Sequence, residues 1–189
     1  MTAQALKASP RSPLAHFAKG QVFRAQHRAE EAISEYETAI AFNHNHVNAL
    51  AAISWCEGYT GSIERVIPVL EQVIRLSPRD PQIGVWFARI GLMHLLQSHL
   101  DEAILWLEKA RNANPELPYV RCHLASAYAL KGEIERAGTE LAEAQKLRRD
   151  GYSSIAQVKA VGYFGGPITY ALYEATFFAG LRKAGMPEE

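Results

Sequence analysis

The chain has 189 residues, 48% of them hydrophobic, and its 20 basic and 20 acidic residues leave a formal net charge of zero. This length suits about one domain with a sizeable core. The balanced charge argues against general nucleic-acid binding, because no net positive field attracts a polyanion. No apolar run reaches the roughly 18 residues that a membrane helix needs, so we expect no membrane contact.

Residues 1–12 are small, polar and interrupted by proline, and we expect a flexible amino-terminal arm without the apolar core of a signal peptide. The segment 1–29 contains five basic side chains and no acidic one: Lys7, Arg11, Lys19, Arg24 and Arg28. Such spread charges are typical of a solvated end rather than of a nucleic-acid arm.

One amphipathic phrase recurs along the chain, in residues 29–42, 63–78, 100–115 and 134–147. Its opening small or branched residue is Ala32, Val66, Ala103 and Ala137, with spacings of 34, 37 and 34. A self-similar period of this size predicts a solenoid of stacked helical hairpins.

A second set of positions precedes each phrase with the same spacings. It holds a small residue, which is Gly20, Ser54, Gly91 and Ala125 in turn. A large residue follows three positions later in most copies, as Phe23, His94 and Tyr128. We expect the small residue to face the large one where the two helices of each hairpin pack together.

These positions resemble the tetratricopeptide-repeat family. The further matching residues are the bulky set Tyr36, Leu70, Leu107 and Leu141, the small set Ala39, Val73, Ala110 and Ala144, and the closing Pro78 and Pro115. The resemblance covers residues 13–147 and implies an all-α, right-handed α-solenoid. Its four tetratricopeptide-like hairpins would span 13–46, 47–80, 81–117 and 118–149.

Two features interrupt the second and third repeats. Pro68 falls inside the helix that begins near Ile63, where proline removes a backbone hydrogen bond. The apolar residues around it keep the helical period, so we expect an exposed kink rather than a break. Three extra residues near Asp80–Ile83 should lengthen the turn or the helix that follows.

Residues 150–189 leave the repeat and predict a helical cap. A short helix within 151–160 would be capped by Ser153 or Ser154, and Pro167 would begin the next helix after a glycine-rich turn. Residues 168–181 are apolar around most of the helix, which predicts burial on more than one side. Alternatively, this helix reaches back into the groove of the solenoid or forms a homodimer.

The tail carries a second resemblance, in the phrases at 126–132, 163–167 and 175–189. These are similar to the repeat-containing, carboxyl-terminal portion of bacterial class III adenylate/guanylate cyclases. The resemblance implies a regulatory or interaction module detached from a catalytic domain.

The sequence predicts no catalytic residue, no cofactor and no metal site. His44 and His46 have no Cys or carboxylate at zinc spacing, and are expected to be polar residues of a turn. Cys122 and His123 are helix neighbours that point in different directions, so they do not indicate a nucleophile pair. Cys56 and Cys122 lie in apolar patterns typical of reduced thiols, which favours a cytoplasmic protein.

The concave face of the first helices is the predicted site. Its residues, called here the groove residues, are Phe17, Gln21, Arg24, Asn48, Ala51, Trp55, Tyr59, Val85, Ala88, Leu92, Leu95, Leu96, Tyr119, Cys122 and Ser126, with Ala129 at the end of the same stripe. Aromatic and apolar residues dominate it, which favours an apolar or amphipathic partner helix or peptide. Only Arg24 and Asn48 match the residues with which relatives clamp an acidic peptide end. Alternatively, Trp55, Leu92 and Leu95 only pack between repeats.

Overall fold

The computed structural model describes residues 9–148, 151–162 and 164–189. Regular structure in these ranges is helical, without strands, which confirms the all-α prediction. Most of the predicted arm (residues 1–8), the expected boundary at 149 and 150, and Tyr163 lie outside the described residues. The chain divides into two compact units, Met1–Asp80 and Pro81–Glu189.

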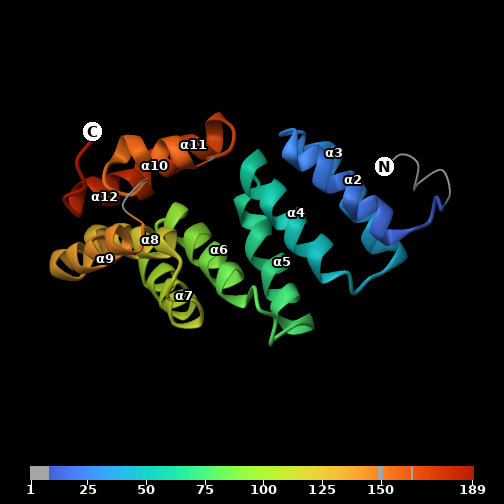
Figure 1. The fold of residues 1–189 in the computed structure, drawn as a ribbon, viewed down its shortest axis with the longest axis horizontal. Coiled ribbons are helices and arrows are strands. Elements are labelled where there is room, and N and C mark those ends of the chain that lie inside the picture. Colours follow the sequence, from blue (N-terminus) through green and yellow to red (C-terminus); the bar gives the residue numbers. More distant parts are fainter. Residues whose placement is uncertain (1–8, 149–150, 163) are drawn as a thin grey trace. The chain divides into compact units, whose positions relative to one another are not determined.

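The first unit holds two consecutive helical hairpins, drawn in blue to green in Figure 1. Its helices are α2 (Pro13–Ala25), α3 (Ala29–Phe42), α4 (Val47–Thr60) and α5 (Ile63–Leu76). Each packs against the next along the chain. Ala32, Tyr36, Ala39 and Cys56 are fully buried in the core between α2, α3 and α4. The repeat period therefore has the predicted consequence, because each helix buries its apolar side on its neighbour.

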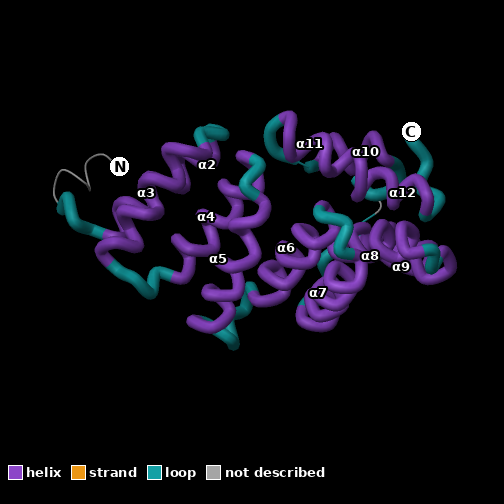
Figure 2. The backbone as a smooth tube through the Cα atoms, turned by 180° about the vertical axis from the view of Figure 1, so that it is seen from behind, coloured by secondary structure: helices purple, strands orange, loops and turns teal. Residues whose placement is uncertain are grey.

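The second unit repeats this arrangement and adds a helical tail (Figures 1 and 2). Its hairpins consist of α6 (Ile83–Leu96), α7 (Leu100–Ala113), α8 (Pro118–Lys131) and α9 (Ile134–Leu147). The tail consists of α10 (Ile155–Val161), α11 (Pro167–Tyr173), the π-helical turn η1 (Glu174–Phe178) and α12 (Ala179–Lys183). We refer to α2, α4, α6 and α8 as the first helices of the four hairpins.

All four first helices end in the same turn. In each copy the first or second residue after the helix has a positive φ. These residues are His27 (58°), Gly61 (103°), Ser98 (61°) and Gly132 (93°). The next N–H donates to the carbonyl five residues back, as in Arg28 to Phe23 (3.0 Å) and Glu133 to Tyr128 (2.8 Å). This is the Schellman arrangement, in which glycine is preferred because it has no Cβ. Two of the four copies use another residue, which hid the position in the sequence.

The small residue of each first helix was predicted to face the large residue three positions later. The structure places a different neighbour against Gly20 and Gly91. A Cβ atom on Gly20 would lie 2.4 Å from Tyr36 Cε1, and one on Gly91 would lie 2.6 Å from Leu107 Cγ. The large neighbours therefore belong to the second helix of each hairpin. The prediction that Phe23, His94 and Tyr128 fill this role was wrong, because residues three apart on one helix share a side and cannot face each other.

Those large residues pack toward the ends of their hairpins instead. The Arg28 guanidinium lies over the Phe23 ring, 4.4 Å from its centre. The Tyr128 hydroxyl donates to Glu108 Oε1 at 2.5 Å, while Arg136 lies over the same ring at 3.9 Å. Tyr128 thus links α7, α8 and α9.

The structure shows how the second and third repeats accommodate Pro68 and the extra residues, while a kink at Pro68 stays a prediction. Helix α5 continues past Pro68, which is exposed, so proline does not break it. The extra residues lengthen the connection between α5 and α6, which spans residues 77–82, whereas residues 43–46 and 114–117 suffice at the corresponding turns.

The tail begins as predicted but lies on the first helices. Ser154 caps α10 by accepting from the Gln157 N–H at 3.2 Å, and Pro167 is the first residue of α11. Helix α12 and η1 then pack against α8, and η1 also contacts α6. Both views show this layer of helices beside α8 (Figures 1 and 2). The tail therefore covers the side of α8 on which groove residues were predicted.

Candidate functional site

In the first unit the groove residues lie on α2 and α4 and differ in exposure. Phe17, Gln21, Trp55 and Tyr59 are half-buried, Arg24 and Asn48 are exposed, and Ala51 is buried. The rings of Trp55 and Tyr59 lie 6.1 Å apart, one helical turn from each other on α4. On α2, Arg24 Nε donates to Gln21 Oε1 at 3.0 Å.

In the second unit most groove residues are buried. Val85 and Tyr119 remain half-buried, while Ala88, Leu92, Leu95, Leu96, Cys122, Ser126 and Ala129 are buried. Leu95 and Cys122 are entirely inaccessible. In this unit a partner can reach the buried positions only if whatever covers them moves.

The tail covers the middle of α8 with a close helix crossing. Ser126 Oγ donates to the carbonyl of Phe177 at 2.9 Å, and both groups are buried. Phe177 belongs to the π turn, where the regular i→i−4 hydrogen-bond pattern is interrupted. Gly180 follows, and a Cβ atom there would lie 2.1 Å from Ser126 Oγ and 2.6 Å from the Ser126 carbonyl. The two helices can approach this closely only because residue 180 has no side chain.

Aromatic residues surround this crossing. The Phe177 ring lies 5.0 Å from the His123 ring and 5.1 Å from Phe178, and Phe164 lies 5.1 Å from Phe178. Leu181 is fully buried beside them. Aromatic pairs at these separations stabilise packing beyond the area that they bury. The contact between Phe177 and His123 joins the tail to α8, whereas the contacts of Phe178 lie within the tail.

A cavity of about 100 Å³ remains between α8 and the tail. Its lining includes Tyr119, Cys122, His123, Tyr152, Val158, Phe164 and Phe177. Burial raises the pKa of the Cys122 thiol to about 12 and lowers the pKa of His123 to about 3, with the nearby Arg89 also lowering the latter. Both groups are neutral at neutral pH, so they do not form the thiolate–imidazolium pair of a cysteine nucleophile.

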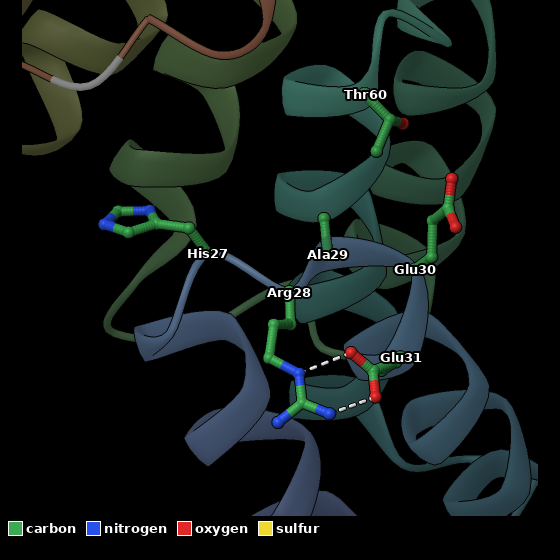
Figure 3. A pocket seen from close by; sticks show the side chains of 6 residues that line it. All are labelled: His27, Arg28, Ala29, Glu30, Glu31 and Thr60. Carbon is green, nitrogen blue, oxygen red and sulfur yellow. Dashed lines mark hydrogen bonds and ion pairs between the residues drawn. The ribbon is translucent and has the colours of Figure 1, made fainter.

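A second, open concavity of about 300 Å³ lies at the turn between α2 and α3 (Figure 3). His27, Arg28, Ala29, Glu30, Glu31 and Thr60 line it. The Arg28 guanidinium forms a bidentate pair with Glu31, shown by the dashed lines in Figure 3. This pair neutralises the local charge, and Glu30 opposes the attraction of the α3 amino end for an anion.

The two histidines considered as metal ligands, His44 and His46, lie in the turn before α4. His46 Nδ1 accepts from the Ala49 N–H at 3.3 Å and caps α4, while its ring lies 5.0 Å from Phe17. His44 is exposed in the preceding turn. Within residues 9–148, 151–162 and 164–189, no three His, Cys, Asp or Glu side chains gather as metal ligands.

Glu57 is a buried carboxylate that sequence reasoning did not treat as a site. Only 2% of it is exposed, and Arg65 Nε lies 3.0 Å from Oε1. Burial is the main cause that raises its pKa, against the opposing effect of Arg65. Arg65 is largely exposed, and the pair links α4 to α5.

Comparison with solved structures shows the fold. YrrB, described as a tetratricopeptide-repeat protein with an unusual peptide-binding site, is 14% identical, with a TM-score of 0.67, over 97% of this chain and 90% of that one. PilF of Pseudomonas aeruginosa is 19% identical, with a TM-score of 0.74, over 97% and 77%. TTC0263, a tetratricopeptide-repeat protein of Thermus thermophilus, is 17% identical, with a TM-score of 0.64, over 92% and 98%.

This chain therefore has the tetratricopeptide-repeat fold of helical hairpins, as its resemblance implied. No protein-family model and no curated protein matches the sequence. These comparisons do not link the chain to nucleotide cyclases, so that resemblance stays a prediction. Among the described residues, no helix is both long enough and apolar enough to span a membrane.

Proposed function

We propose that this protein is a non-catalytic interaction scaffold whose first helices bind an apolar or amphipathic helix of a protein partner. One observation carries the proposal: in the second unit an apolar helix already lies on α8, where Ser126 bonds to Phe177 and Gly180 makes the closest approach. A surface that holds one such helix has the chemistry to hold another. The helix is the chain's own tail.

The first unit has an aromatic first-helix face of its own. Trp55 and Tyr59 are large, half-buried and one turn apart on α4, and residues of this type most often anchor interfaces. Arg24 and Asn48 are exposed near the ends of the α2 and α4 stripes, where they supply polar contacts around an apolar centre. This combination suits an amphipathic partner better than an acidic chain end.

The test compares partner capture by two full-length variants. The chain is immobilised, exposed to extract of its native cell, and the captured proteins are quantified by mass spectrometry. Trp55→Ala should reduce a specific partner by about tenfold or more, because truncation of an interface anchor costs about 2 kcal/mol or more. Leu76→Ala, at an exposed residue 39% accessible at the end of α5, is the matched control and should retain it. Equal capture by wild type and Trp55→Ala would contradict the proposal.

Self-association through residues 168–181 remains a second candidate. Tyr173, Phe177, Phe178 and Leu181 are buried within the chain, but Ile168 and Tyr170 of the same segment stay 70% and 38% exposed. A dimer would use these two side chains, or would require the tail to exchange between copies. Light scattering at high micromolar concentration decides, since a mass equal to one chain dismisses this candidate.

A further inference from the structure

The face of α8 beneath the tail is lined by small residues at helical spacing. Cys122, Ser126 and Ala129 follow one another at intervals of four and three along the helix, so they share one side. All three are fully inaccessible. Small side chains leave α8 with a shallow surface, on which a second helix can lie with its backbone close.

The segment seated on this surface has a short pattern that fits it. Gly180 lies against the Ser126 backbone, where a Cβ atom would be 2.9 Å from Ser126 Cα. Phe177 and Phe178 precede the glycine by three and two residues, Leu181 follows it, and all three are buried. Residues 177–181 therefore have the pattern of two aromatic residues, any residue, glycine and leucine.

The tail has polar interactions of its own. The N–H groups of Ile155 and Ala156 donate to the carbonyls of Pro187 and Glu188, each at 2.9 Å, so the chain end closes onto the start of α10. Glu174 pairs with both Lys159 and Arg182. The tail consequently keeps its own polar network when it separates from α8.

Hydrogen bonds also join the tail to α8. They include the bond from Ser126 Oγ to the Phe177 carbonyl, and one from Lys183 Nζ to the Leu130 carbonyl at 3.5 Å. The second lies at the limit of hydrogen-bond length. Release of the tail uncovers the small-residue face of α8, on which an incoming apolar helix can restore the lost apolar contacts.

We propose that residues 177–181 are a resident ligand of the α8 face, and that the partner is a helix carrying the same aromatic–aromatic–x–Gly–Leu pattern, which binds when the tail leaves. This inference rests on the proposed scaffold function and names its partner class. The resident segment lowers the apparent affinity for the partner, because only the fraction of chains with a released tail can bind.

A labelled peptide of residues 167–189 tests the proposal on the full-length chain. Gly180→Leu in the chain places a side chain where Ser126 already lies, so it should displace the tail and leave the α8 face intact. By fluorescence anisotropy, this variant should bind the peptide about tenfold or more tightly than wild type, since its face is free. The same peptide carrying Gly180→Leu should bind neither chain.

Ala175→Leu is the matched control, because residue 175 lies in the same helical segment but is exposed. This variant should bind the peptide as weakly as wild type. Circular dichroism verifies that each variant is folded. If Gly180→Leu does not fold, Phe177→Ala replaces it, since the loss of the ring beside His123 weakens the contact between the tail and α8 without adding bulk.

Amide hydrogen exchange shows whether the tail has been released in each variant. A folded variant with a released tail that binds the peptide no better than wild type overturns the proposal. Equal binding of the wild-type and Gly180→Leu peptides also overturns it, because the glycine would then not be recognised. The peptide assay needs no cellular partner, so its failure is distinct from a failure of Trp55-dependent capture.

Discussion

The two units contain the same hairpins but present different first-helix faces. In the first unit that face combines half-buried Trp55 and Tyr59 with exposed Arg24 and Asn48. In the second unit the corresponding positions are small or aliphatic apart from Tyr119, and the tail lies on Ser126 through Phe177 and Gly180. The repeat determines the hairpin, whereas residues outside the repeat determine what lies on its face.

The hairpins are alike because the same few positions make the same contacts. Gly20 lies against Tyr36 in the first unit as Gly91 lies against Leu107 in the second. Each first helix also ends in the same positive-φ turn. Faces that differ on equivalent hairpins indicate that binding and stability depend on separate sets of residues.

The largest effect should come from Phe177→Ala, which removes a buried ring that lies 5.0 Å from the His123 ring of α8. We expect the free energy that holds the tail on α8 to fall by about 3–5 kcal/mol, as for other buried phenylalanines. Hydrogen exchange should then become faster in α10–α12 and α8 but not in α2–α5. Ile168→Ala, at a residue 70% exposed, is the control. Faster exchange in both units would contradict the separation of their roles.

Next in size is Ser126→Ala. The Phe177 carbonyl would lose its Ser126 donor while buried, which costs about 1–3 kcal/mol of the free energy of unfolding. Thr38→Ala in the first unit removes only a hydroxyl that donates to the Ser34 carbonyl within its own helix. This substitution should change the free energy of unfolding by less than about 0.5 kcal/mol. Urea denaturation measures the free energy of unfolding of both variants. Equal losses would show that the Ser126 hydrogen bond stabilises the fold no more than the Thr38 hydrogen bond does.

Each unit contains a buried titratable group with a shifted pKa. These two groups should make the free energy of unfolding depend on pH in opposite directions. His123 has a folded-state pKa of about 3, against an ordinary value of 6.5, because of burial and Arg89. The unfolded chain therefore binds a proton that the folded chain rejects, and stability should fall as pH decreases from 6.5 toward 3, by about 1.4 kcal/mol per pH unit at most. Glu57 has a raised pKa, so its contribution to stability falls as pH rises instead.

Urea denaturation at pH 7 and pH 5 tests this difference. His123→Phe should reduce the loss of stability at the lower pH, because the ring packs beside Phe177 without a titrating group. His123 Nδ1 has no hydrogen-bond partner among the described residues, so little is lost by the substitution. If His123→Phe loses as much stability between pH 7 and pH 5 as wild type does, other titrating groups cause the loss.

The smallest effect should be the same in both units. His27→Gly and Ser98→Gly each place glycine at a positive φ, and each should raise the free energy of unfolding by about 1 kcal/mol. Gln26→Gly, at a φ of −90°, is the control and should not stabilise. Thermal denaturation gives the three values. A gain in only one unit would mean that the hairpin turns are not equivalent.

The regular part of the fold could be predicted from the sequence because it repeats. The spacings of 34, 37 and 34 between equivalent positions predicted the hairpins, and Ser154 and Pro167 predicted the starts of α10 and α11. The small residue at position 20 was recognised, but its neighbour Tyr36 was not. Sequence spacing within one helix does not show which residue approaches from the next helix.

The site was predictable only as a list of first-helix residues. The apolar segment 168–181 indicated burial, yet its binding surface could have been the stack end, the groove or a second copy. The deciding feature is Gly180, since its missing side chain makes room for Ser126 on α8. A single glycine in an aromatic helix was the available signal, and recognising its meaning required the position of α8.

Nuclear Overhauser spectroscopy of the full-length chain tests the central claim directly, through the protons of Gly180. The close crossing predicts strong cross-peaks between the Gly180 α-protons and the β-protons of Ser126, which belongs to a different helix far away in the sequence. Cross-peaks from Gly180 confined to its own helix would contradict a tail seated on the α8 face.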